Sequence, residues 1–167
     1  EMKYFAYGTN CNADVLARKQ VNARSRERAA LHGHRLRFNK RALRERLPEG
    51  IGFANVELAP GHRVEGILYD LPDEDVAHLD AAERCPEHYE RVDVEVETDG
   101  GPVRAFTYRA RPEVTASGLR PSRNYLNHIA SARDFLSRQY FEALEAHEVF
   151  EGTCAACGRA KEVVFIS

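Results

Sequence analysis

Apolar and polar residues alternate with a period of two through much of the middle of this chain, which is the pattern of half-buried β-strands. The clearest example is residues 89–98, where valines at every second position share one face and charged residues share the other. Asp99-Gly100-Gly101 then favours a tight turn, and an apolar strand pattern resumes over residues 103–109. These residues together predict a β-hairpin.

Four more strands are predicted in short apolar runs bounded by turn-forming residues. They lie at residues 3–7, 35–38, 51–58 and 64–71. The last two are separated by Pro60-Gly61, a dipeptide that favours a tight turn, so we expect them to form a second hairpin.

Helices are predicted on either side of this group of strands. The first covers residues 12–18 with Asn12 as its N-cap, and the second covers residues 72–85 and is opened by Pro72. A long helical region is expected over residues 121–148. Because the strands cluster between helical regions and do not alternate with them, the fold class expected is α+β.

The length of the chain predicts one domain, and its net charge is close to zero. It has 167 residues and a formal net charge of −2, so nothing overall favours nucleic acid. Residues 18–46 hold eleven basic and two acidic residues, but almost no aromatic residue stands among them for stacking on bases. We expect this segment to be a solvated surface, with a partner-binding role left open. Nucleic-acid binding is disfavoured.

No apolar run approaches the roughly twenty residues that span a bilayer, and no basic, apolar and cleavable leader begins the chain. We therefore expect no membrane contact and a cytoplasmic location. The four cysteines are too few and too unevenly spaced for a disulfide framework, so reduced thiols are expected.

The domain is expected over residues 2–150, with residues 151–167 as a C-terminal extension. Cys154-Ala155-Ala156-Cys157 in this extension is half of the ligand set of a structural zinc site. A tight turn with two free thiols is the favoured interpretation, while a reversible disulfide and a zinc site completed by another subunit stay open. An apolar run at residues 163–166 predicts one extra strand.

The end of the first strand carries the clearest sign of a ligand site. Tyr7-Gly8-Thr9-Asn10 joins an apolar strand to a helix that begins within a few residues. A turn of this kind directs several backbone N–H groups at one point, beside a helix N-terminus that favours negative charge. The sequence therefore predicts a cradle for a carboxylate or an oxyanion.

A carboxylate is predicted on the buried face of the second helix. Val76, Leu79 and Glu83 follow at i, i+3 and i+7, which is the spacing of one apolar stripe. Burial and the negative end of the helix dipole would both favour the neutral form of an unpaired carboxylate there, which suits it to exchange protons near pH 7. The plainer alternative is a glutamate at a helix end that reaches solvent or an arginine.

Taken together, these motifs resemble the γ-glutamylcyclotransferase family, which includes γ-glutamylamine cyclotransferases. Tyr7-Gly8-Thr9-Asn10 is similar to the family's Tyr-Gly-Ser-Asn loop, and Leu79-Asp80 followed by Glu83 matches the segment that carries its catalytic glutamate. Pro121-Ser122-Arg123-Asn124-Tyr125 matches its Pro-Ser-x-x-Tyr, and Phe106-Thr107-Tyr108 also falls in family order. The resemblance covers residues 3 to about 145. The chain departs from the family pattern at Thr9, where serine is usual, and at Cys11.

The resemblance implies a small closed mixed β-barrel flanked by helices, with a pocket at one mouth. It implies an enzyme that releases 5-oxoproline and a free amine from a small γ-glutamyl substrate, with Glu83 as general acid and base. Tyr7, Gly8, Thr9, Asn10, Tyr108 and Tyr125 would bind that substrate, and no metal or other cofactor is required. The alternative is a non-catalytic relative that binds a small carboxylate or a protein partner, although a binder of anions gains nothing from a buried carboxylate.

Overall fold

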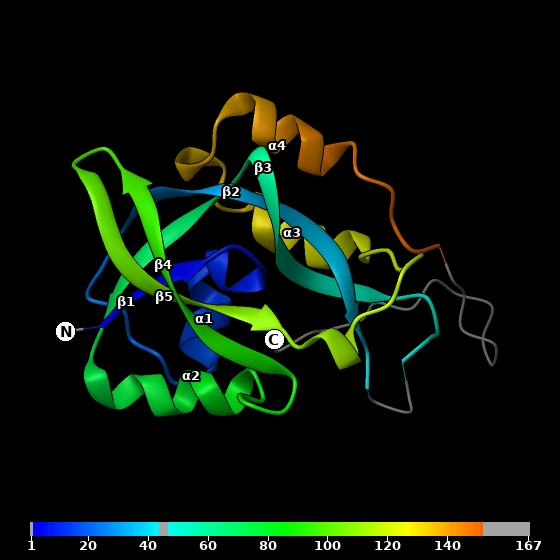
Figure 1. Ribbon diagram of the computed structural model, residues 1–167, viewed down its shortest axis with the longest axis horizontal. Helices are drawn as coiled ribbons and strands as arrows, with labels where there is room; N and C mark the ends of the chain where they lie inside the picture. Colours follow the sequence, from blue (N-terminus) through cyan, green and yellow to red (C-terminus); the bar gives the residue numbers. More distant parts are fainter. Residues whose placement is uncertain (1, 44–46, 152–167) are drawn as a thin grey trace.

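The computed structural model describes residues 2–43 and 47–151. Five strands close into a barrel in the order β1-β3-β2-β4-β5, and all neighbours are antiparallel except β1 and β5, which run parallel. The strands are β1 (Met2–Ala6), β2 (Ser25–Arg41), β3 (Gly52–Leu71), β4 (Tyr89–Thr98) and β5 (Gly101–Ala110). The expected mixed barrel of α+β class is therefore confirmed (Figure 1).

The two longest strands, β2 and β3, differ from their prediction. The hairpin expected at Pro60-Gly61 is wrong, because both halves of β3 pair with β2: Arg63 opposes His32 and Leu58 opposes His34. Residues 59–62 form a bulge opposite Gly33, and Gly61 and Gly33 have φ angles of +83° and +74°. Proline and glycine here serve a bulge in one continuous strand, which bends the sheet toward closure.

Barrel closure depends on a close approach between β1 and β3. Gly66 lies where a Cβ atom would fall 2.0 Å from the carbonyl oxygen of Ala6, so only glycine allows this contact. β1 pairs with β3 along its whole length and meets β5 at Tyr4 and Phe106. The end of β1 therefore lies in the wall of the barrel.

Four short α-helices flank the barrel: α1 (Ala13–Arg18), α2 (Val76–Ala82), α3 (Arg123–Ala130) and α4 (Arg138–Glu145). Asn12 caps α1 as predicted, its side chain accepting a hydrogen bond from the Asp14 backbone. The single helical region expected over residues 121–148 is divided into α3 and α4. The division has a local cause: Ser137 caps α4, and its N–H and hydroxyl both bond to Glu65 of β3.

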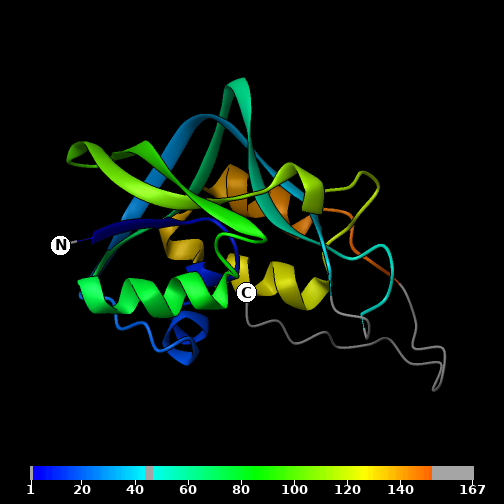
Figure 2. The same cartoon turned by 60° about the horizontal axis from the view of Figure 1, so that its bottom comes forward.

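Buried side chains form two clusters on the two sides of the barrel wall. One contains Phe5 and Val56 and includes Ile129 of α3 and Leu144 of α4. The other contains Tyr4 of β1 and includes Leu79 of α2. Figure 2 shows α2 running along the outside of the barrel, away from α4. Alternate residues of β1 thus face different clusters, as the period of a strand requires.

The predicted cysteine turn at residues 154–157 and the strand at 163–166 lie outside the described residues. Within the described part of the chain, every helix is too short or too polar to cross a membrane.

Candidate active site

A small pocket, with a cavity volume of about 30 Å³, opens where the turn after β1, the end of α2 and the start of α3 meet. The residues that line it are Tyr4, Tyr7, Gly8, Thr9, Asn10, Ala54, Glu83, Tyr89, Tyr108 and Tyr125. All seven residues predicted for the site are therefore together in one pocket. Their roles toward a substrate stay a prediction.

The turn after β1 presents free backbone donors to this pocket. The 3₁₀ turn η1 (Thr9–Cys11) starts directly after Gly8, and its internal hydrogen bonds begin with the N–H of Cys11. Within the described residues, the N–H groups of Gly8, Thr9 and Asn10 donate to no backbone or side-chain acceptor. Three successive unpaired amide donors beside a pocket match the predicted cradle for negative charge.

Gly8 has a φ of −103°, which any residue adopts, so its backbone does not require glycine. The space around Gly8 is tight, however, because a Cβ atom there would lie 3.3 Å from the Ala54 Cβ and 3.4 Å from the Tyr125 hydroxyl. A side chain there would press on two residues of the pocket wall.

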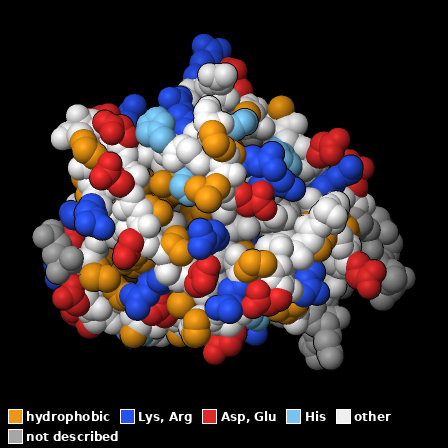
Figure 3. Space-filling view, in the orientation of Figure 1, with side chains coloured by type: hydrophobic (Ala, Val, Ile, Leu, Met, Phe, Trp, Pro, Cys, Tyr) orange, Lys and Arg blue, Asp and Glu red, His pale blue; other side chains and the backbone are white. Residues whose placement is uncertain are grey.

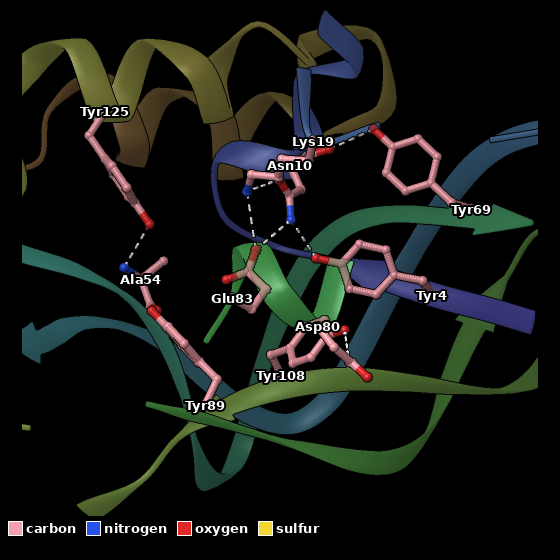
Figure 4. A network of polar contacts seen from close by, with 10 residues as sticks. All are labelled: Tyr4, Asn10, Lys19, Ala54, Tyr69, Asp80, Glu83, Tyr89, Tyr108 and Tyr125. Atoms are coloured by element: carbon pink, nitrogen blue, oxygen red, sulfur yellow. Dashed lines mark hydrogen bonds and ion pairs between the residues drawn. The ribbon is translucent and has the colours of Figure 1, made fainter. Parts of the chain in front are cut away.

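Glu83 lies directly after α2, and only 7% of its surface is exposed. Its Oε1 accepts hydrogen bonds from Asn10 Nδ2 at 2.9 Å and from Lys19 Nζ at 3.1 Å. Its Oε2 makes no hydrogen bond or ion pair with any described residue, and in Figure 4 it points away from Lys19 toward Ala54. One carboxylate oxygen is thus fixed by the protein and the other faces the pocket.

The buried position predicted for Glu83 is confirmed, but the expectation of an unpaired carboxylate is wrong. Lys19 is fully buried and forms an ion pair with it at 3.1 Å. No local pattern of residues indicates this contact, because Lys19 stands in the basic segment expected to be solvated. Lys40, in the same segment, is also buried and contacts His88 at 3.0 Å.

Five tyrosines surround the carboxylate and hold each other and the backbone in place. Tyr7 donates to the carbonyl of Tyr108, Tyr89 donates to the carbonyl of Ala54, and the Ala54 N–H donates to the Tyr125 hydroxyl. Burial raises the pKa of all five hydroxyls, so they stay protonated near neutral pH. Tyr4, Tyr89 and Lys19 were not predicted as site residues.

Two of these hydroxyls are placed by side chains. Tyr108 donates to Asp80 of α2, one turn before Glu83. The Tyr4 hydroxyl accepts from Asn10 Nδ2 and donates to no described acceptor, so its own proton is available to a ligand. Asn10 therefore contacts Tyr4, Glu83 and Lys19 at once (Figure 4).

The surface charges and the possible metal ligands narrow the class of ligand that the pocket could bind. Basic and acidic side chains are interspersed over the face in Figure 3, where Lys and Arg gather into no single patch. Among the described residues, no three His, Cys, Asp or Glu side chains are grouped as metal ligands. The site as described is a small pocket with one carboxylate, phenolic hydroxyls and free amides. These groups suit a small ligand that carries both an ammonium and an anionic group.

The comparisons with known proteins agree with this description. A family model described as gamma-glutamyl cyclotransferase, AIG2-like, matches residues 4–127, so the chain belongs to that family. Among curated proteins there is no significant match. A solved structure titled gamma-glutamyl cyclotransferase is 22% identical, covers 92% of this chain and 91% of its own, and has a TM-score of 0.77.

Two further solved structures have the same fold. The uncharacterised protein LOC79017 from Homo sapiens is 23% identical, with coverage of 92% and 91% and a TM-score of 0.75. YkqA from Bacillus subtilis is 24% identical, and the match covers 86% of this chain and 52% of that one with a TM-score of 0.73. At these identities the likeness shows the barrel fold alone.

Proposed function

We propose that this protein is a γ-glutamylcyclotransferase, which converts a small γ-glutamyl compound into 5-oxoproline and a free amine. The single observation that carries the proposal is the Glu83 carboxylate. Its Oε1 is fixed by Asn10 and Lys19, and its Oε2 has no partner within residues 2–43 and 47–151 and faces the pocket. An anion-binding pocket has no use for such a group, whereas a reaction that moves protons from an ammonium does.

Glu83 would act first as a base. The α-amino group of a γ-glutamyl compound has a reference pKa of about 8 and is mostly protonated at pH 7. It must lose a proton before its nitrogen lone pair can attack the γ-carbonyl carbon. The free Oε2 faces the pocket, where it can accept that proton and attract the ammonium at the same time.

Glu83 would then act as an acid, so that the protons balance over the cycle. Attack forms the ring C–N bond and moves the carbonyl π electrons to oxygen. As the oxyanion collapses, the bond to the leaving nitrogen breaks, and that nitrogen keeps the electron pair. The ring nitrogen loses two protons in all and the leaving nitrogen gains two, each passing in turn through the carboxylate. Glu83 finishes the cycle ionised.

The turn after β1 would hold the negative charge of the substrate. The amides of Gly8, Thr9 and Asn10 have no acceptor among the described residues, and they can bind the α-carboxylate or the oxyanion. The Tyr4 proton is a further donor of the same kind. Fixed donors of this sort need no reorganisation during the reaction, and tyrosine rings on several sides favour a folded, ring-closing conformation.

The experiment is the release of 5-oxoproline from a panel that shares the glutamyl end and differs in the amine. γ-Glutamyl amino acids, glutathione, γ-glutamyl-lysine isopeptide and γ-glutamylated secondary metabolites form the panel, and the corresponding α-glutamyl peptides are matched controls. We expect turnover of at least one γ-glutamyl compound and of none of the α-glutamyl controls. Binding of 5-oxoproline without turnover of any member would favour the non-catalytic alternative.

A further inference from the structure

A fully buried ammonium, which does not line the pocket, contacts the Glu83 carboxylate. The Lys19 side chain has 0% exposed surface, and its Nζ lies 3.1 Å from Glu83 Oε1 and 2.5 Å from Asn10 Oδ1. Lys19 follows the last residue of α1, and Glu83 follows the last residue of α2. The ends of these two helices thus bring together opposite charges on residues that are 64 positions apart in the sequence.

We propose that Lys19 is a positioning residue for the proton-transfer cycle of Glu83. It fixes which carboxylate oxygen faces the substrate, and its charge favours the return of the proton to the leaving amine. This inference rests on the proposed function of the site.

The contacts around Asn10 support the first part of the inference, that Lys19 fixes which carboxylate oxygen faces the substrate. Lys19 has only donors, so it makes Asn10 Oδ1 and Glu83 Oε1 both acceptors. That contact sets the orientation of the Asn10 amide, whose nitrogen must then face the other way. Nδ2 accordingly donates to Glu83 Oε1 and to the Tyr4 hydroxyl. The three side chains form a closed set of contacts that leaves Oε2 as the oxygen available for protons (Figure 4).

The charge of Lys19 supports the second part of the inference, that it favours the return of the proton to the leaving amine. Lys19 is the only cation within ion-pairing distance of Glu83 in the described chain, and the pair is neutral before the reaction. Among the described residues, the other titratable groups that interact electrostatically with Glu83 are the hydroxyls of Tyr4, Tyr7, Tyr89, Tyr108 and Tyr125. Burial raises the pKa of each, so they add no charge near neutral pH.

Once Oε2 has taken a proton from the substrate, Lys19 is left as a buried cation beside a neutral acid. That state is unfavourable in a low-dielectric interior, and release of the proton to the leaving nitrogen restores the ion pair. Lys19 neither gives nor accepts a proton itself. Its charge opposes proton capture slightly and favours proton delivery, which is the step that breaks the C–N bond.

The test compares Lys19→Met and Lys19→Arg with the unmodified protein. The pH dependence of kcat/KM for 5-oxoproline release is measured, and the carbon-13 carboxyl resonance of Glu83 is followed against pH without substrate. With Lys19→Met we expect the acid limb of the rate profile to move up by about one pH unit, and kcat to fall about tenfold or more. Lys19→Arg should keep the position of the limb.

A matched control is Arg63→Met, which removes a cation from a different buried glutamate, Glu65, at 3.1 Å. Its rate profile and the Glu83 titration should stay unchanged. Should Lys19→Met fail to fold, Lys19→Gln replaces it, because its amide can still donate to Asn10 without carrying charge.

The outcomes separate this inference from the proposed function. Unchanged pH profiles and an unchanged Glu83 titration in an active, folded Lys19 variant would overturn the role of Lys19 alone. Absence of 5-oxoproline release from the unmodified protein would overturn the proposed function. In that case the carboxyl titration still decides whether Lys19 controls the protonation of Glu83.

Discussion

Two glutamates, Glu83 and Glu65, are each 7% exposed, but the barrel treats their carboxylates in opposite ways. Where β3 meets α4, Glu65 Oε1 accepts a hydrogen bond from the Ser137 N–H at 2.6 Å. Its Oε2 accepts one from the Ser137 hydroxyl at 2.7 Å and forms an ion pair with Arg63 at 3.1 Å. At the pocket, both partners of Glu83 bond to Oε1 alone.

The difference teaches what distinguishes a structural carboxylate from a candidate catalytic one. Burial is equal, and each glutamate has a cationic partner, so neither property separates them. The separating property is an oxygen without a protein partner that faces a pocket. Among the described residues, Glu65 has no such oxygen, because both of its oxygens accept hydrogen bonds from Ser137, the N-cap residue of α4, whereas Glu83 has one.

Replacing Glu83 should produce the largest loss of activity. Glu83→Gln keeps the shape of the side chain but removes the proton acceptor, and general acid–base catalysis typically contributes about a hundred- to ten-thousand-fold in rate. We expect kcat for 5-oxoproline release to fall within that range. A variant that keeps most of its activity would exclude the mechanism.

Glu83→Gln should also cost stability, which the sequence alone did not suggest. It leaves the buried Lys19 cation without its counter-charge, and breaking a buried pair in this way costs about 3–5 kcal/mol. The double variant Glu83→Gln/Lys19→Met is the control. Urea denaturation should show stability partly restored in the double variant, while activity stays as low as in Glu83→Gln.

Alkaline pH should destabilise the folded state mainly through the tyrosines of the pocket. All seven tyrosines have a pKa raised by burial, and five of them line the pocket. The folded state therefore keeps protons that the unfolded chain releases above about pH 10. Their stabilising contribution is complete below pH 10 and is lost as pH rises, by up to about 1.4 kcal/mol per pH unit for each tyrosine.

Absorbance at the tyrosinate band and circular dichroism, recorded together against pH, provide the measurement. We expect both signals to change in one cooperative transition above pH 10. Tyrosinate absorbance that rises near pH 10 with the fold intact would show that these hydroxyls are accessible to solvent.

Glu65→Gln is the counterpart of Glu83→Gln, and we expect it to lower stability without lowering activity. A glutamine offers one acceptor oxygen, whereas the carboxylate accepts hydrogen bonds from the Ser137 N–H and hydroxyl and pairs with Arg63. A buried donor therefore loses its partner at a cost of about 1–3 kcal/mol. The unfolding free energy should fall by that amount, while kcat and KM stay within about twofold of the unmodified protein. A drop in kcat comparable to that of Glu83→Gln would end the distinction between the two carboxylates.

Features that depend on neighbouring residues could be predicted from the sequence, whereas contacts between residues far apart along the chain could not. The Val76, Leu79 and Glu83 stripe is a local pattern on one helix, so the burial of Glu83 was predictable, and alternation over residues 89–98 likewise predicted β4. The Lys19 contact joins residues 64 positions apart and follows no local period. The bulge at Pro60-Gly61 was missed because the same dipeptide favours a hairpin turn when local chemistry alone is considered.

Gly8→Ala should weaken substrate binding more than stability. The added methyl would lie 3.3 Å from Ala54 and 3.4 Å from the Tyr125 hydroxyl, so the pocket wall must move by a few tenths of an ångström. We expect KM to rise by about tenfold, which corresponds to roughly 1.4 kcal/mol, with a melting temperature close to that of the unmodified protein. A lower melting temperature with unchanged KM would mean that Gly8 serves only the packing of the turn.

Thr9→Val should have the smallest effect, and it separates the backbone of the turn from its side chain. The Thr9 Oγ1 atom is buried and has no hydrogen-bond partner among the described residues, so its desolvation is uncompensated there. Valine has nearly the same shape without the hydroxyl, and we expect the unfolding free energy to rise by up to about 1 kcal/mol. KM should stay within about twofold, because the N–H of residue 9 is unchanged. A tenfold rise in KM would show that the hydroxyl itself binds the substrate, whereas Thr9→Ser, which keeps the hydroxyl, should then restore binding.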